Sequence, residues 1–206
     1  RYSRLHALIN SAGVFMLTRH ETVDGLETTF VVNHLAPFLL TNLLLDMLKM
    51  SAPARIVNVS STAQEANYIK LDDLQSEQGY RPMRVYSQSK LAMVLFTYEL
   101  ARRLEGTGVT VNCLHPGFVA TNIGQGNLVL PLRALVKLML SRIGISPEQG
   151  AKTSLYLASS PDVEGVTGKY FVRGVPKKTA PLSYDESLQR QLWAASAKLV
   201  KLPVEV

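Results

Sequence analysis

Hydrophobic residues along this chain fall into short, β-branched runs separated by longer stretches with helical spacing. The short runs cover residues 7–9, 55–59 and 109–114, and small or polar residues follow each one. Runs of this kind are typical of strands that are buried on both faces of a parallel sheet. We predict strands in these three places and a fourth over residues 167–172.

Two long segments carry apolar residues at intervals of three and four, which is the spacing of one helix face. The first segment predicts a helix over residues 26–48, opened by Asp24 and Gly25. The second predicts a helix over residues 84–105, followed by Gly106. Glycine is a common helix stop, so we expect this helix to end there.

Two later serines each precede a glutamine or glutamate by three residues, the capping-box spacing that marks a helix start. The pairs are Ser146–Gln149 and Ser183–Glu186. They predict helices over residues 147–158 and 184–199.

The predicted strands alternate with helices, which indicates right-handed β–α–β connections and a parallel sheet covered on both faces. The chain has 206 residues, of which 47% are hydrophobic. That is enough for one sizeable core and too little to assume two domains. We therefore predict a doubly wound α/β fold in a single domain over residues 1–206.

Composition argues against several classes of function. The net charge is +6, but the 22 basic residues are scattered, unlike the dense runs of a nucleic-acid-binding surface. No run reaches the ~18 apolar residues of a membrane span, and the N-terminus lacks a signal-peptide pattern. The single cysteine, Cys113, cannot form an internal disulfide. We therefore expect a reducing, cytoplasmic compartment and no nucleic-acid partner.

Tyr86 and Lys90 are candidates for acid–base chemistry. They stand four residues apart in the second predicted helix, so their side chains share one face. A phenol with its ordinary pKa of about 10 is a poor base at neutral pH, but a neighbouring ammonium stabilises the phenolate. Taken alone, however, a solvated helix face is the better interpretation of this pair.

Further polar groups support the pair. Ser60 and Ser61 follow the predicted strand over residues 55–59, at the strand end where open α/β sheets bind ligands. Ser61 can hydrogen-bond a substrate oxygen whose charge changes, although a turn-capping serine is the competing interpretation. Pro37 cannot donate to the carbonyl of Asn33, four residues earlier. That carbonyl is then free for an ordered water, or else the helix simply kinks there.

The segment after the third predicted strand is a candidate for holding polar ligand groups. It contains His115, Pro116, Gly117, Val119 and Thr121. Its backbone groups and the Thr121 hydroxyl can hold a carboxamide at the ligand-binding end of the sheet. No residue nearby in the sequence orients His115, so we interpret it as structural rather than as a base.

Together these elements resemble the classical short-chain dehydrogenase/reductase family over essentially the whole chain. The family's motifs correspond to Asn10-Ser11-Ala12-Gly13 (NNAG), Asn33, Ser61, Tyr86 with Lys90 (YxxxK), and Pro116-Gly117 (PG). The segments VNHLAPFLLT at 32–41 and RQLW at 190–193 are similar to the retinol dehydrogenase branch. The resemblance implies a Rossmann-like fold and hydride transfer between NADP(H), or NAD(H), and an apolar alcohol, aldehyde or ketone.

The resemblance also assigns roles to residues. Tyr86 would be the general acid or base, Lys90 would lower its pKa and bind the nicotinamide ribose, Ser61 would steady the substrate oxygen, and Asn33 would hold a relay water. The other cofactor-binding residues would be Asn10, Ala12 and Gly13 on the adenosine side, with Pro116, Gly117, Val119 and Thr121. No metal is expected.

The chain lacks the family's glycine-rich phosphate loop, TGxxxGxG. A complete Rossmann unit needs roughly 80 further residues upstream, including the turn that holds the pyrophosphate. We therefore expect a part of a longer enzyme without its first βαβ units. The strand at residues 7–9 should then be an exposed sheet edge.

Some alternatives remain open at this point. Residues 128–145 predict an amphipathic substrate lid, with contact to an anionic membrane surface as the less favoured reading. The main alternative function is a noncatalytic cofactor-sensing or scaffold protein of the same fold, and the second is an extended-type epimerase or dehydratase. Intact Ser61, Tyr86 and Lys90 favour an enzyme, and the PG motif favours the classical dehydrogenase. By analogy with relatives, we expect a homo-oligomer formed through the helices around Asn33 and Tyr86.

Overall fold

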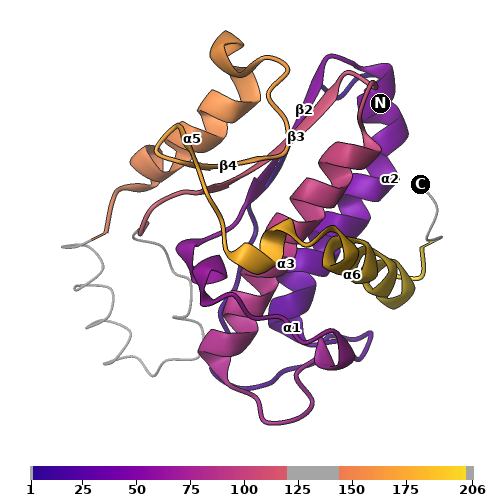
Figure 1. Cartoon of the computed structure of the whole chain (residues 1–206), viewed down its shortest axis with the longest axis vertical. Helices are drawn as coiled ribbons and strands as arrows, with labels where there is room; N and C mark the ends of the chain where they lie inside the picture. The colour runs from indigo at the N-terminus through magenta and orange to yellow at the C-terminus, as the bar shows by residue number, and fades with distance from the viewer. Residues whose placement is uncertain (1, 120–143, 203–206) are drawn as a thin grey trace.

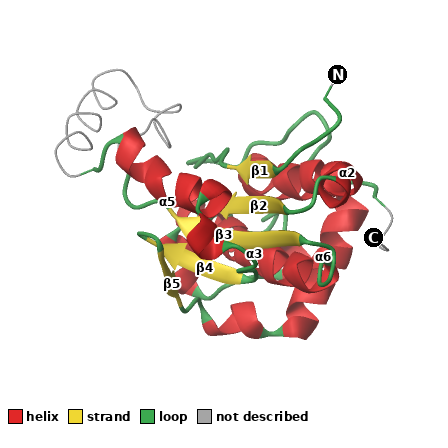
Figure 2. Ribbon diagram, turned by 90° about the horizontal axis from the view of Figure 1, so that it is seen from above, coloured by secondary structure: helices red, strands yellow, loops and turns green. Residues whose placement is uncertain are grey.

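The computed structural model describes residues 2–119 and 144–202, and its centre is one five-stranded sheet. The strands are β1 (Ala7–Asn10), β2 (Ala54–Val59), β3 (Val109–His115), β4 (Lys169–Val172) and β5 (Val175–Lys177), and they lie in sequence order. The first four are parallel, and β5 pairs antiparallel with β4. Helices lie on both sides of the sheet (Figures 1 and 2). The predicted α/β class is confirmed.

The strand β5 was not predicted from the sequence. It follows β4 through a two-residue turn in which Arg173 and Gly174 have φ angles of 52° and 75°. Two consecutive positive φ angles define the tight hairpin turn that matches the twist of the flanking strands. The sequence signal for this hairpin was Gly174, which lies between Val172 and Val175.

Three helical segments follow one another without a break over residues 28–50. They are α1 (Thr28–Phe30), the π-helical turn η1 (Val31–Leu35) and α2 (Ala36–Met50). The stretch Thr28–Met50 is long and apolar enough to cross a membrane by length and composition alone. Its residues Phe38, Leu45 and Leu48 are buried in a core cluster with Ile56 of β2. We therefore interpret it as a core helix.

The remaining helices are α3 (Pro82–Arg103), α5 (Pro147–Ser159) and α6 (Glu186–Leu199). The short 3-10 segments are η2 (Thr62–Ala66), η3 (Leu71–Asp73), η4 (Pro161–Val163) and η5 (Pro181–Tyr184). All four long helices that the sequence predicts are present, with ends shifted by at most two residues.

Side-chain capping explains where the helices begin. The capping box of Ser146 and Gln149 is confirmed. The predicted box at Ser183 is wrong, because Asp185 caps α6 by accepting a hydrogen bond from the Leu188 backbone. Similarly, α1 begins after Glu27, whose carboxylate accepts bonds from two backbone amides of the first turn. Oxygen acceptors of this kind satisfy amides that have no partner within the helix.

Alternate residues of the strands show which helix covers each face of the sheet. Ile56 and Val111 pack in a cluster with residues of α2, α3 and α6. Val57 and Leu114 pack with Leu157 of α5. Since successive side chains of a strand point to opposite faces, α5 lies on the other side of the sheet from α2 and α3, as Figure 1 shows.

This placement corrects one expectation about chain connections. The strands β1 to β4 are parallel and follow one another across the sheet. The connection from β3 through α5 to β4 runs over the opposite face, so it has the opposite hand to the two connections before it. The general preference for right-handed connections therefore does not hold for all three. In the sequence, residues 116–146 separate β3 from α5.

The helix α6 packs across α3 and buries Leu192, Trp193 and Ala197. Of the 22 residues of α3, 15 are buried, so much of the helix surface is already used within the chain. The helix α2 instead exposes apolar side chains, among them Leu43 and Met50. The homo-oligomer stays a prediction. If subunits associate through these helices, α2 has more apolar surface available for the contact than α3.

A buried chain of hydrogen bonds joins β1 and β2 to the two long helices. Asn10 Nδ2 donates to Thr41 Oγ1 of α2 at 3.0 Å and to Asn58 Oδ1 of β2 at 2.8 Å. Asn58 Nδ2 in turn donates to Thr97 Oγ1 of α3 at 2.9 Å. All four side chains are buried. Each polar group therefore depends on its partner, because a buried group without one is costly.

His34, which the sequence did not single out, lies inside an aromatic cluster. Its ring is fully buried beside Phe30, Phe38 and Phe96. Its Nε2 lies 2.8 Å from Ser196 Oγ of α6. Burial disfavours the charged imidazolium, which lowers the pKa of His34 to about 3. His34 therefore joins η1 to α6 in its neutral form.

We predict that this histidine makes the fold sensitive to acid. Between about pH 6.5 and pH 3 the unfolded chain binds a proton at His34 that the folded chain does not. Stability is therefore lost as the pH falls through this range, by at most about 1.4 kcal/mol of unfolding free energy per pH unit for one proton. Urea unfolding at a series of pH values measures this. His34→Gln should show a shallower decline, and a decline as steep as that of the wild type would contradict the prediction.

We also predict that Asn10→Ala destabilises the fold. The change leaves buried groups of Thr41 and Asn58 without a partner, which should lower the unfolding free energy by about 1–3 kcal/mol. The neighbouring Ser11 is exposed, so Ser11→Ala is a matched control with little expected effect. Equal stability of the two variants in denaturant titration would show that the buried bonds contribute nothing.

Candidate functional site

The four predicted catalytic residues come together near the carboxyl ends of the parallel strands. Lys90 Nζ lies 5.6 Å from the centre of the Tyr86 ring and donates a hydrogen bond to the Val59 carbonyl of β2 at 3.2 Å. Ser61, just after β2, hydrogen-bonds Tyr86. A Cβ atom added to Gly13 would lie 3.5 Å from both Asn33 Oδ1 and Lys90 Nζ. The structure thus brings together groups from three separate segments of the chain.

The helix α3 supplies both Tyr86 and Lys90. It begins with Pro82 at its first turn, where a missing backbone N–H has no cost. One turn separates Tyr86 from Lys90, so both point to the same side. The helix is anchored to the strand end by Ser60, whose Oγ donates to the Lys90 carbonyl at 2.8 Å.

Lys90 is a buried cation with unused donors. Only 4% of its surface is exposed, and burial lowers the pKa of its ammonium to about 8. An ammonium has three N–H donors, and among the described residues Nζ donates to one acceptor, the Val59 carbonyl. The free donors point to a ligand with hydroxyl or other acceptor oxygens, which fits the ribose of a nicotinamide cofactor.

The pKa of Tyr86 differs from the expectation. Burial raises the pKa of its phenol above the ordinary value, and the hydrogen bond with Ser61 opposes this rise only in part. The net shift is upward, and a lowering contribution of Lys90 to this pKa stays a prediction. Burial disfavours the phenolate more strongly than the surrounding groups favour it, and Lys90 Nζ is directed to a backbone carbonyl.

Ser61 combines the two interpretations that the sequence left open. Its Oγ accepts a hydrogen bond from the Ala63 backbone at 3.2 Å and so caps the 3-10 turn η2. The same side chain hydrogen-bonds Tyr86. The cap fixes the hydroxyl beside the phenol, so the structural role serves the site.

Asn33 lies in the π-helical turn η1. Pro37 offers no N–H to its carbonyl, and the helix widens so that Ala36 donates to the Val31 carbonyl, five residues earlier. The Asn33 side chain is fully used: Oδ1 accepts from Val14 N at 2.8 Å, and Nδ2 donates to the Val14 carbonyl at 3.0 Å and to Ser89 Oγ at 3.0 Å. Any relay water would therefore bind at the backbone carbonyl rather than at the amide.

The predicted adenosine-side residues are placed unevenly. The Asn10 side chain faces the helices and donates to Thr41 and Asn58, so it supports the fold, and a role of Asn10 in cofactor binding stays a prediction. Ala12 is exposed and Gly13 is half-buried. The small size of Gly13 leaves the approach to Asn33 and Lys90 open.

The segment after β3 packs tightly against the residues that precede and begin α5. Gly117 has a φ of +95°, and a Cβ there would lie 2.6 Å from Ile145 Cδ1, so only glycine fits without strain. The Val119 side chain packs against Gly150 of α5, and its backbone N–H donates to the Gly117 carbonyl at 3.1 Å. Pro116, directly before Gly117, is half-buried. Thr121 and most of the predicted lid, residues 128–143, lie outside the described residues.

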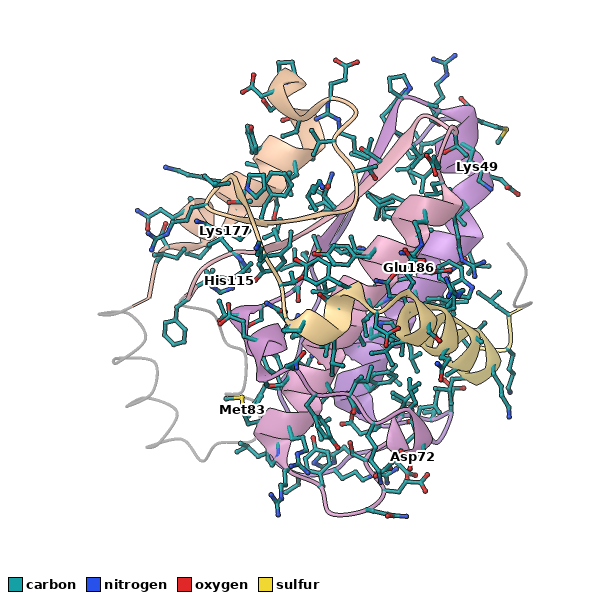
Figure 3. The ribbon with its side chains drawn as sticks, in the orientation of Figure 1. Lys49, Asp72, Met83, His115, Lys177 and Glu186 are labelled. Carbon is teal, nitrogen blue, oxygen red and sulfur yellow. The ribbon has the colours of Figure 1, made fainter. Side chains whose placement is uncertain are left out.

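His115 is the last residue of β3 and so lies at the carboxyl end of that strand (Figure 3). Burial lowers its pKa, and the positive charges of Arg173 and Lys90 lower it further. Within the described part of the chain its buried Nδ1 has no hydrogen-bond partner. The imidazole is thus neutral at neutral pH, and its interpretation as structural stays a prediction.

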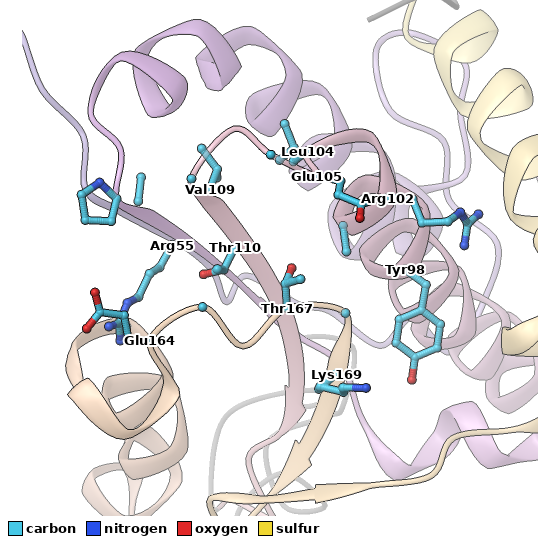
Figure 4. Close-up of a pocket in the computed structure, with 18 of the residues that line it drawn as sticks. Arg55, Tyr98, Arg102, Leu104, Glu105, Val109, Thr110, Glu164, Thr167 and Lys169 are labelled. Carbon is cyan, nitrogen blue, oxygen red and sulfur yellow. The ribbon is translucent and has the colours of Figure 1, made fainter.

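A large pocket of about 980 Å³ lies at the opposite end of the strands (Figure 4). Its wall includes Arg55, Thr110 and Lys169, at the amino ends of β2, β3 and β4. Open α/β sheets bind their ligands at the carboxyl ends of the strands. We therefore place the candidate site at Tyr86 and not in this pocket.

Sequence reasoning missed two residues that contact Tyr86. Ser89 Oγ donates to the Tyr86 carbonyl at 2.7 Å. The Phe15 ring meets the Tyr86 ring edge to face, with centroids 5.4 Å apart and an angle of 72°. Ser89 lies inside the YxxxK motif, which was a usable signal, whereas nothing in the sequence links Phe15 to Tyr86.

Comparisons with known proteins agree with this geometry. A family model for short chain dehydrogenase matches residues 1–128. The chain is 52% identical to retinol dehydrogenase 14 of Homo sapiens, covering 97% of this chain and 60% of that protein. It is 44% identical to polyprenol dehydrogenase of Homo sapiens, covering 95% and 61%. The chain therefore spans about 60% of the length of these curated relatives.

Solved structures give the same result. An uncharacterized protein from Mycobacterium paratuberculosis matches with a TM-score of 0.76 at 32% identity, covering 100% of this chain and 70% of that one. The NADPH-bound carbonyl reductase from chicken fatty liver matches with a TM-score of 0.58 at 26% identity, covering 86% and 66%. The motifs, the fold and these matches together show that the chain, which is similar to the retinol dehydrogenases, belongs to the short-chain dehydrogenase family.

Proposed function

We propose that the full-length protein is an oxidoreductase that interconverts an apolar alcohol with its aldehyde or ketone, using NADP(H), with Tyr86 as the proton-transfer residue. One observation carries this proposal. The Tyr86 phenol is hydrogen-bonded to Ser61 and lies one helix turn from the buried Lys90 ammonium. A phenol, a hydroxyl and a cation in this arrangement can move a proton to or from a substrate oxygen.

A bound nicotinamide supplies or accepts the hydride, and the residues of this chain handle the proton. For reduction, the raised pKa keeps Tyr86 protonated at neutral pH, ready to donate a proton to the carbonyl oxygen. For oxidation, the reacting form of Tyr86 is the phenolate, which the Ser61 hydroxyl and the Lys90 charge stabilise and which accepts the alcohol proton. Ser61 also donates a hydrogen bond to the substrate oxygen.

The names of the relatives support the choice of substrate and cofactor. The matched curated proteins are a retinol dehydrogenase and a polyprenol dehydrogenase, both named for long apolar alcohols. One matched structure is a carbonyl reductase with NADPH bound. Exposed or half-buried apolar side chains, Phe15, Met83 and Phe118, lie in the segments next to Tyr86 and after β3. They suit an apolar rather than a charged substrate.

We predict that Tyr86→Phe in the full-length protein lowers turnover of retinal with NADPH by about 100-fold or more, because a positioned acid or base contributes that much. NADPH affinity, measured by fluorescence titration, should change little. Tyr98→Phe is the matched control, since Tyr98 lies on the same helix and bonds Thr179 instead. Near-normal turnover in Tyr86→Phe would refute the assignment of the proton-transfer residue.

The cofactor preference has its own test. Full-length protein should bind NADPH more tightly than NADH, and binding can be followed by cofactor fluorescence. Tighter binding of NADH would overturn the NADP(H) part of the proposal while leaving the role of Tyr86 untouched.

A further inference from the structure

Ser89 occupies a special place on the catalytic helix. It is fully buried and lies between Tyr86 and Lys90 in the sequence. Its Oγ donates to the Tyr86 carbonyl at 2.7 Å. A serine inside a helix commonly bonds the preceding turn in this way, so this bond alone has no special meaning.

The second bond of Ser89 comes from another helix. Asn33 Nδ2, in the π-helical turn η1, donates to Ser89 Oγ at 3.0 Å. The same amide also bonds Val14 twice. Asn33 Oδ1 accepts a hydrogen bond from the Val14 backbone N–H, and Nδ2 donates one to the Val14 carbonyl. One hydroxyl therefore connects η1 to α3 within three residues of the phenol.

Asn33 also fixes the position of Phe15. Because Val14 is bonded through both its backbone groups, the next residue has little freedom. The Phe15 ring then contacts the Tyr86 ring edge to face at 5.4 Å, a favourable aromatic geometry. Tyr86 is thus held at its backbone by Ser89 and at its ring by Phe15, and the Asn33 amide connects the two contacts through Ser89 Oγ and Val14.

This arrangement matters because proton transfer depends strongly on geometry. A displacement of about 1 Å at a reacting group can cost on the order of 100-fold in rate. Without the Ser89 hydroxyl, one N–H of the buried Asn33 amide has no acceptor, which is unfavourable. The amide or the helix would then move, and Tyr86 would move with it.

We propose that Ser89 and Phe15 are positioning residues that hold the Tyr86 phenol in place through the Asn33 amide. The inference rests on the proposed role of Tyr86 in proton transfer. Neither residue needs to touch substrate or cofactor for this role.

The test compares Ser89→Ala with Ser87→Ala in the full-length protein. Ser87 is buried on the same helix, so its substitution reports the general cost of removing a buried hydroxyl. Ser89→Ala should lower kcat for retinal reduction by about 10-fold, the effect of one lost hydrogen bond. KM and NADPH affinity should stay close to wild type, and the pH at which kcat is half-maximal should shift. Ser89→Thr, which restores a hydroxyl, should recover part of the loss.

A wild-type kcat and pH profile in Ser89→Ala would overturn the inference. Should Ser89→Ala fail to fold, Phe15→Leu carries the test, because it removes the ring contact at a half-buried position. Phe15→Leu should show the same fall in kcat and the same pH shift, with Leu17→Ala as the control from the same exposed segment. Unchanged kinetics in Phe15→Leu would again overturn it.

Tyr86→Phe, measured in parallel, separates the two proposals. Retained turnover in Tyr86→Phe means that the proposed function itself is wrong. An inactive Tyr86→Phe beside a normal Ser89→Ala means that only the positioning inference is wrong.

Discussion

A single missing backbone hydrogen bond shapes the candidate site. Pro37 has no N–H to give to Asn33, and the long helix over residues 28–50 widens into a π-helical turn at this point. The wider turn presents the Asn33 amide to Val14 and Ser89. Turns of this kind are rare inside helices and are often found at functional sites. The segment with Phe15 and the helix with Tyr86 and Lys90 are aligned through that amide.

Burial controls the electrostatics of the same site. Lys90 is almost fully enclosed, and its pKa falls to about 8, whereas burial raises the pKa of Tyr86. Both shifts favour neutral groups, because a low-dielectric interior penalises charge of either sign. In the folded chain the phenol is therefore protonated at neutral pH.

The surrounding fold gives this site a rigid support. The Asn10, Thr41, Asn58 and Thr97 side chains join two strands to two helices within the core. His34 links η1 to α6 in an aromatic cluster. Buried polar groups of this kind specify one arrangement, since any shift leaves them without partners. These bonds explain why the side chain of Asn10, a residue of the predicted ligand-binding motif, supports the fold.

The sequence by itself determined the fold class, the four parallel strands, the four long helices and the pairing of Tyr86 with Lys90. These features depend on local patterns: hydrophobic periodicity, capping spacing and the four-residue interval that places two side chains on one helix face. The tertiary structure decided everything that depends on contacts between distant segments. It placed α5 on the opposite face, directed the Asn10 side chain to α2, raised the pKa of Tyr86 and set Ser89 and Phe15 against it. Burial and hydrogen bonding between residues far apart in the chain have no local sequence pattern, so only the folded molecule shows them.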